Sequence, residues 1–108
     1  MAQPSKTAKM TLLTIIGSSE LQDRLIEDLR GAGAKGYTFA LAGGGGRHGP
    51  RKRGMWDTGN IRIESIVSAD VATRMLARID EDYEGQSLVA FVHDVQAAPH
   101  KHFAVKDS

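Results

Sequence analysis

The sequence predicts an α+β fold, a ferredoxin-like βαββαβ sandwich with one long loop between its second and third strands. Apolar residues recur at strand or helix spacing in six segments, in the order strand, helix, strand, strand, helix, strand. The 108 residues are enough for one domain with a modest core, which favours burial of more surface between subunits. The segment 42–59, between the second and third strands, is far longer than a hairpin turn requires.

The first predicted unit is a strand followed by a helix. Residues 10–16 are rich in branched apolar side chains and predict a buried strand that ends at Gly17. The segment 19–22, Ser-Glu-Leu-Gln, matches a capping box that starts a helix, and Gly31 and Gly33 supply its stop. The apolar face of this helix repeats at helical spacing and consists of Leu21, Leu25, Ile26, Leu29 and Ala32.

Two strands are predicted on either side of the long loop. Residues 37–41 alternate large apolar and smaller side chains, which is typical of a strand. In residues 60–64 the alternation predicts that Ile61 and Ile63 face the core while the charged residues between them face outward.

A second helix and a last strand complete the pattern. The helix is expected to begin after Ser68 or Asp70 as its cap and to end at Gly85. Residues 88–95 predict a strand that is apolar on both faces, so the sheet face without helices should also be covered. The predicted inner face of the helix consists of Val71, Ala72, Met75, Leu76, Ile79 and Tyr83.

Composition indicates an ordinary soluble domain. The net charge is +1 and there are no cysteines, which excludes disulfides and thiol catalysis and favours a reducing cytoplasm. Residues 1–9 form a polar, flexible tail without the apolar stretch of a signal peptide, and no segment approaches the length of a membrane span. We therefore expect one cytoplasmic domain over residues 10–103, followed by a short tail at 104–108.

The long loop carries the strongest functional signal. It opens with four glycines, Gly43 to Gly46, and continues with Arg47 and the basic run Arg51 to Arg53. Successive glycine N–H groups can surround one anion, and arginines add paired hydrogen bonds to phosphate oxygens. The loop thus suits a phosphorylated ligand, or a smaller anion such as a carboxylate or bicarbonate. Arg53, Met55 and Trp56 are candidates for contact with a protein partner.

Other interpretations of the loop remain open from the residues alone. A solvated, flexible connection would show the same composition. A Gly/Arg-rich segment near Trp56 also fits an oligomeric ferredoxin-like module that binds RNA, although no basic surface elsewhere extends such a footprint. Gly44 to Gly49 matches the dinucleotide-binding glycine pattern, but Pro50 and the basic run argue against the helix that this pattern needs.

Four segments together resemble the PII-type signal-transduction proteins, in particular the PII-like branch linked to inorganic-carbon uptake and carboxysomes. The four segments are Gly33 to Thr38, the glycines Gly43 to Gly46, Asn60 to Glu64, and the turn Asp82-Tyr83-x-Gly85. The resemblance covers Leu12 to Val95.

The resemblance implies a homotrimer with adenine nucleotides bound in the clefts between subunits. Segment 42–59 would be the family's T-loop, which changes shape with the ligand and docks on a target protein. The target could be a bicarbonate transporter or a carboxysome-related component. The residues expected in the nucleotide and anion site are Thr38, Gly44, Gly46, Arg47, Arg51, Glu64, Gly85, His100, Lys101 and His102.

Departures from the nitrogen-sensing branch narrow the ligand. His48 stands where those members carry a glutamine for magnesium and 2-oxoglutarate, and the turn from Glu84 to Ser87 lacks their lysine. Fewer cations near the phosphates favour ADP or AMP over ATP, and the remaining arginines could accept bicarbonate.

No catalytic site and no metal site are predicted. The histidines, among them His100 and His102, have no acid or cysteine at a usual ligand spacing, so cleft or surface positions are expected. The same two histidines and Lys101 could face phosphate, which would make binding sensitive to pH. No nucleophile has an activating partner at a suitable spacing. We therefore expect a non-enzymatic regulatory protein that reports carbon or energy status through its loop.

Overall fold

The computed structural model describes residues 6–43, 45–46, 49–50 and 59–103, and its elements follow the predicted order. The strands β1 (Ala8–Ser18), β2 (Thr38–Ala42), β5 (Asn60–Val67) and β6 (Leu88–Ala97) form one sheet in the order β2-β5-β1-β6. All three neighbouring pairs are antiparallel. The α+β, ferredoxin-like prediction is confirmed.

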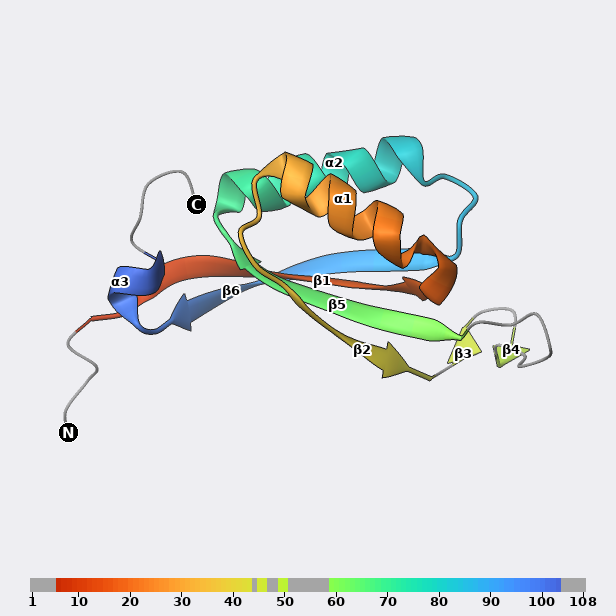
Figure 1. Cartoon of the computed structure of the whole chain (residues 1–108), viewed down its shortest axis with the longest axis horizontal. Helices are drawn as coiled ribbons and strands as arrows, with labels where there is room; N and C mark the ends of the chain where they lie inside the picture. The colour runs from red at the N-terminus through yellow and green to blue at the C-terminus, as the bar shows by residue number, and fades with distance from the viewer. Residues whose placement is uncertain (1–5, 44, 47–48, 51–58, 104–108) are drawn as a thin grey trace.

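Two helices, α1 (Gln22–Ala32) and α2 (Ala69–Asp82), lie side by side on one face of the sheet (Figure 1). A short helix, α3 (His100–Phe103), lies at one end of the sheet, beside the start of β1. At the other end two short strands, β3 (Gly45–Gly46) and β4 (Gly49–Pro50), pair with each other within the long connection from β2 to β5. None of the described helices is long and apolar enough to cross a membrane.

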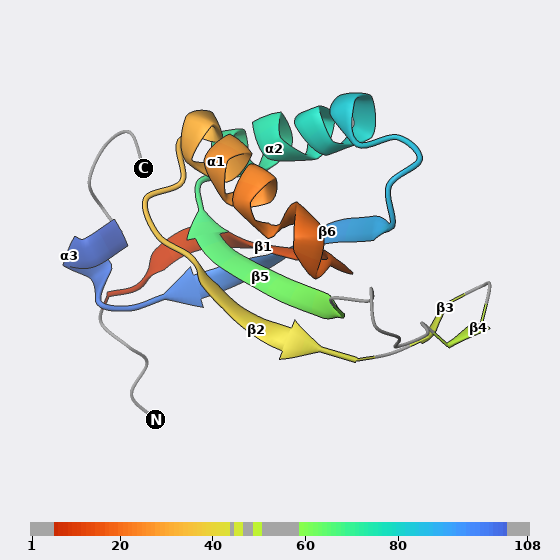
Figure 2. The ribbon, with the colours of Figure 1, turned by 45° about the vertical axis from the view of Figure 1, so that its right-hand side comes forward.

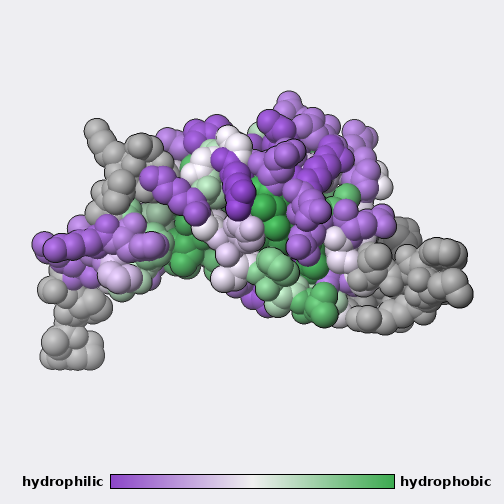
Figure 3. Space-filling model, in the orientation of Figure 1, coloured by the Kyte–Doolittle hydropathy of each residue, from purple (hydrophilic) through white to green (hydrophobic). Residues whose placement is uncertain are grey.

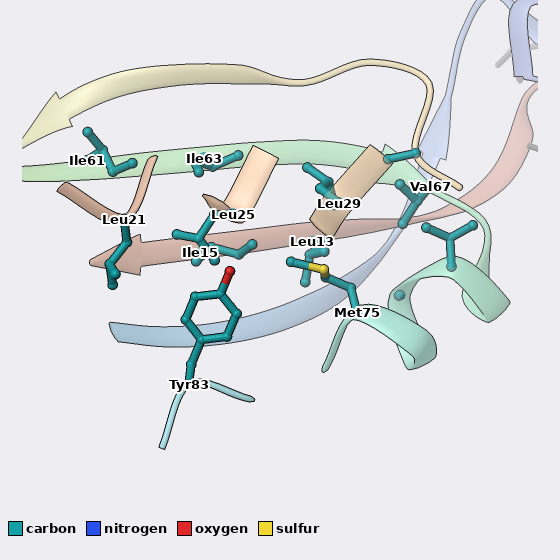
Figure 4. Packing of buried hydrophobic residues seen from close by; sticks show 13 residues of the cluster. Leu13, Ile15, Leu21, Leu25, Leu29, Ile61, Ile63, Val67, Met75 and Tyr83 are labelled. Atoms are coloured by element: carbon teal, nitrogen blue, oxygen red, sulfur yellow. The ribbon is translucent and has the colours of Figure 1, made fainter. Parts of the chain in front are cut away.

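The core lies between the sheet and the two helices (Figure 4). Leu13 and Ile15 of β1, Ile63 of β5, and Leu25 and Leu29 of α1 are each at most 1% exposed. Burial of such side chains contributes about 1.5–3 kcal/mol each. The predicted helix faces and the inward phase of β5 are thus confirmed, and Tyr83 closes the core beyond the end of α2.

Several predicted boundaries are wrong, and Gly17 shows why most clearly. It does not end the first strand, because β1 continues through it to Ser18 and pairs Gly17 with Leu88. A Cβ built on Gly17 would lie 2.7 Å from the Leu88 Cβ and 3.0 Å from the Ser87 carbonyl oxygen. The glycine is therefore required for close packing of two strands rather than for a turn.

The predicted caps of α1 also differ in detail. A 3-10 turn (Ser19–Leu21) precedes the helix, so α1 begins at Gln22, three residues after the serine of the predicted capping box. Gly31 lies inside the helix, whereas Gly33 alone provides the left-handed C-cap at φ +117°.

The end of α2 and the tail were also predicted incompletely. The helix begins as expected with Ser68, whose Oγ accepts a hydrogen bond from the Val71 N–H. It ends at Asp82 with Tyr83 as C-cap, so Gly85 belongs to the following turn. The last strand runs on to Ala97, and α3 follows it.

Among the described residues, the sheet face opposite α1 and α2 is covered only at one end, where Phe103 of α3 packs against Ala8, Met10 and Ala97. On this face Ile66 is 41% exposed, Val89 59% and Phe91 42%. The edge strand β2 exposes Phe39 and Leu41 as well, and Figure 3 shows apolar colouring over this strand. These surfaces match the sequence expectation that the sheet needs cover from outside the single chain.

Candidate ligand-binding site

A pocket of about 420 Å³ lies at the α3 end of the sheet. Its wall combines the ends of β1 and β5, the connection from α1 to β2, and α3, which Figure 2 shows at the same end of the molecule. The lining residues are Met10, Leu12, Gly33, Ala34, Lys35, Gly36, Tyr37, Thr38, Glu64, Ser65, Ile66, Val67, His102 and Phe103. The size and the mixed apolar and polar wall are those of a small-molecule site.

The connection between α1 and β2 is shaped by specific backbone contacts. Gly33 ends α1 in the left-handed conformation and its N–H bonds to the Arg30 carbonyl oxygen at 3.0 Å. From α2, Arg74 donates two hydrogen bonds to the Ala32 carbonyl oxygen, at 3.1 and 2.8 Å. A guanidinium at a helix C-terminus also interacts favourably with the helix dipole. The chain therefore leaves α1 in a fixed direction toward the pocket.

Polar groups enter the pocket from two adjacent strands and from α3. Thr38 and Glu64 are register partners across β2 and β5. The Glu64 carboxylate accepts a hydrogen bond from Arg62 at 2.6 Å, an ion pair that is largely exposed. His102 of α3 also lines the pocket, and its ring is edge-on to the Phe103 ring at a centroid distance of 4.6 Å. The structure thus brings together three residues that the sequence nominated: Thr38, Glu64 and His102.

α3 is held in place by a second, small apolar cluster. Ala8, Met10 and Ala97 are buried there, and Phe103 packs against them. His100 and Lys101 belong to the same short helix but do not line the pocket.

Other predicted residues lie at the opposite end of the sheet or outside the described residues. Gly46 lies in β3 and Gly85 in the turn before β6, where its φ is +84°. Neither lines the pocket, and β3 and the turn between α2 and β6 lie at the opposite end of the sheet from α3 (Figure 1). Gly44, Arg47, Arg51, Arg53, Met55 and Trp56 lie outside the described residues.

The far end is itself an organised junction. The Ser18 N–H bonds to the Ser87 carbonyl oxygen at 3.2 Å, and the Ser19 N–H bonds to the Gly59 carbonyl oxygen at 3.0 Å. The end of β1 therefore ties the turn that contains Gly85 to the point where the long loop re-enters the sheet. The base of the loop and this turn are neighbours, whereas the pocket lies along the sheet from them.

Sequence reasoning missed several pocket residues, and Ser65 is the most informative. Its place in the inward phase of β5, two residues after Ile63, put a polar side chain where the pattern demanded an apolar one. A polar residue at a core-facing position could therefore have indicated a specific role for Ser65. Lys35 and Phe103 carried no comparable signal, because their role depends on the path of a connection and of a tail.

Outside the pocket, one polar network joins the two helices. The Tyr83 hydroxyl donates to the Asp28 carboxylate at 2.7 Å, Arg78 pairs with the same carboxylate at 3.2 Å, and the Arg24 guanidinium lies 4.2 Å from the Tyr83 ring centre. Burial, followed by the hydrogen bond to Asp28, raises the pKa of Tyr83 far above its ordinary range. Among the described residues no group of three or more histidine or acidic side chains forms a metal site.

Comparison with known proteins assigns the chain to a family. Residues 10–101 match the family described as nitrogen regulatory protein P-II. A PII-like signalling protein from Thermus thermophilus has 34% identity and a TM-score of 0.74, with 91% of this chain and 98% of that chain covered. CPII from Thiomonas intermedia, solved with ADP and bicarbonate, has 29% identity and a TM-score of 0.77, with 87% and 93% covered. No curated protein matches the chain.

The fold and the matched structures define a PII-like protein. The chain belongs to the P-II family, since the family match spans most of its length. The resemblance inferred from the four sequence segments is thereby confirmed at the level of the family. GlnK from B. subtilis, solved with ATP, is only 19% identical and shares the fold, at a TM-score of 0.56. CPII has also been solved with ADP, AMP and bicarbonate together.

Proposed function

We propose that this protein is a non-enzymatic, PII-like regulator that binds an adenine nucleotide, with ADP or AMP favoured over ATP, and bicarbonate beside it. The observation that carries the proposal is the pocket at the α3 end, where Thr38, Glu64 and His102 meet an apolar wall. An apolar wall with a few polar groups suits a base and ribose. The ligands in the CPII structures, ADP, AMP and bicarbonate, support the same choice.

The nucleotide site is shared between subunits of a homotrimer. Within one chain the pocket lies at one end of the sheet, whereas Gly46 and the Gly85 turn lie at the other. Strand β5 runs from the loop end at Asn60 into the pocket, and at about 3.3 Å per residue its pocket residues, Glu64 to Val67, lie roughly 13–23 Å from Asn60. Phosphates that contact the loop base would therefore come from a nucleotide held in the pocket of a neighbouring subunit. The exposed apolar residues of β2 and β6 supply surface for that contact.

The long loop reports the ligand to a target protein in the cytoplasm. A ligand that binds one loop conformation better shifts the population toward it, by at most its differential affinity. Arg53, Met55 and Trp56 are the proposed target contacts, and a bicarbonate transporter or a carboxysome-related component is the proposed class of target.

Calorimetry with ATP, ADP, AMP, 2-oxoglutarate, bicarbonate and RNA oligonucleotides tests this function. We expect ADP or AMP to bind, bicarbonate to tighten that binding, and Arg47→Ala or Arg51→Ala to abolish it. Steeply salt-dependent RNA binding without any nucleotide response would instead support the RNA-binding alternative.

Mixed trimers test the shared site. Glu64→Ala damages the pocket half of each site and Arg47→Ala damages the loop half, so each pure variant should lose binding. In a mixed ring one interface joins two intact halves, so about one third of the sites should recover. Absence of any recovery, with mixing confirmed by native mass spectrometry, would show that both halves belong to one chain.

A further inference from the structure

Ser65 is a buried polar residue that contacts the connection between α1 and β2, the part of the pocket wall that contains no helix or strand. Its side chain is 3% exposed, and its hydroxyl donates to the Gly36 carbonyl oxygen at 2.5 Å. Gly36 and Ser65 both line the pocket, and the hydrogen bond joins β5 to the connection between α1 and β2. Its neighbours in the same inward phase, Ile63 and Val67, are apolar core residues.

We propose that Ser65 is a positioning residue for the nucleoside end of the ligand site, an inference that rests on the proposed function. The connection is fixed where it leaves α1, by Arg74 and by the conformation of Gly33. It is fixed again at Thr38, where β2 pairs with Glu64. Ser65 holds the stretch between these two points against β5, and so keeps the pocket wall formed before a ligand arrives.

The surroundings of Gly36 indicate that loss of this hydrogen bond would lower the affinity for the ligand. Gly36 is exposed, so without Ser65 its carbonyl can turn to water instead of staying buried and unsatisfied. A Cβ built on Gly36 would meet no protein atom within 4 Å, so there is room for this residue to move on that side, although Ala34 and Tyr37 next to it pack against the core. The freed connection must then be ordered when the ligand binds, which lowers affinity through lost preorganisation.

The experiment compares ADP, adenosine and pyrophosphate binding to the full chain and to two variants. Ser65→Ala removes the hydroxyl, and Ser65→Cys nearly preserves the volume while replacing a good donor with a weak one. A hydrogen bond of ordinary strength predicts that Kd for ADP and adenosine rises together, by about five- to tenfold, in both variants. Pyrophosphate, which lacks a nucleoside, should bind as in the parent chain.

Ser68→Ala is the matched control, since it also deletes a serine hydroxyl near the end of β5. The Ser68 hydroxyl caps α2, and Ser68 does not line the pocket. The substitution should lower stability and leave Kd for adenosine unchanged. Normal ADP binding by Ser65→Cys with weak binding by Ser65→Ala would assign the effect to volume and overturn the inference. An equal loss for pyrophosphate would also overturn it, because the effect would then be general. Failure of the parent chain to bind any of the three ligands would overturn the proposed function itself.

NMR of the unliganded chain gives a readout that does not depend on affinity. Backbone order parameters at residues 35–37 should fall in Ser65→Ala and stay unchanged in Ser68→Ala. Unchanged order in both variants would remove the basis for preorganisation by Ser65.

Discussion

Two glycine-to-alanine substitutions should change stability in opposite directions, although the chemical change is the same. At Gly17 the added methyl would lie 2.7 Å from the Leu88 Cβ and 3.0 Å from the Ser87 carbonyl oxygen. Leu88 is fixed by the β1–β6 pairing and the Ser87 carbonyl by its hydrogen bond from the Ser18 N–H, so the strands must separate to restore ordinary contact. Overpacking of this kind costs about 1–3 kcal/mol. For a chain of this size each kcal/mol lowers Tm by roughly 4–8 °C.

Gly31 is the matched control. It lies inside α1, and a Cβ built there meets nothing within 4 Å. Alanine is favoured over glycine within a helix by about 0.8–1.0 kcal/mol, so Gly31→Ala should raise Tm by several degrees. The assay is thermal and urea unfolding followed by circular dichroism at one fixed protein concentration, since assembly makes Tm depend on concentration. A Gly17→Ala variant as stable as the parent chain would refute the steric argument.

Two further predictions concern the helices. Tyr83→Phe removes the hydrogen bond to Asp28 and should cost about 1 kcal/mol of unfolding free energy, measured by urea titration. Because folding raises the pKa of Tyr83, its contribution is complete below the unfolded pKa of about 10 and is lost as the pH rises above it. The slope of stability against pH above 10 should therefore be shallower in Tyr83→Phe, and an unchanged slope would exclude this tyrosine as its source. Ser68→Ala removes the cap on the Val71 N–H and should cost about 1 kcal/mol, whereas Ser68→Asp, which keeps an acceptor, should cost less.

The topology could be predicted from the sequence because its signals are local and periodic. The alternation that placed Ile61 and Ile63 inward, and the helical spacing of Leu25 and Leu29, depend on neighbours within a few residues. Gly17 could not be interpreted in the same way. Its requirement comes from Leu88, which is distant in sequence, and a glycine needed for close packing looks the same in sequence as one needed for a turn.

The candidate site was predictable only in part, for a related reason. Thr38 and Glu64 were nominated through a family resemblance, and the pairing of β2 with β5 does bring them into one pocket. The participation of Ser65 depends on where the connection from α1 passes over β5, and no periodic pattern encodes that path. The only local sign of this role in the sequence is that Ser65 is a polar residue at a core-facing position of β5.

The arrangement also bears on how binding could be coupled to the loop. The β1 end holds the Gly85 turn and the loop base together through Ser18 and Ser19. A phosphate group bound at this junction would act on the loop directly, whereas a base bound in the pocket would contact the other end of β2 and β5. In the proposed trimer, each ligand would then join the wall of one subunit to the loop base of the next. Ligand binding would then strengthen subunit association by the same factor by which association strengthens ligand binding, since linkage between them is reciprocal.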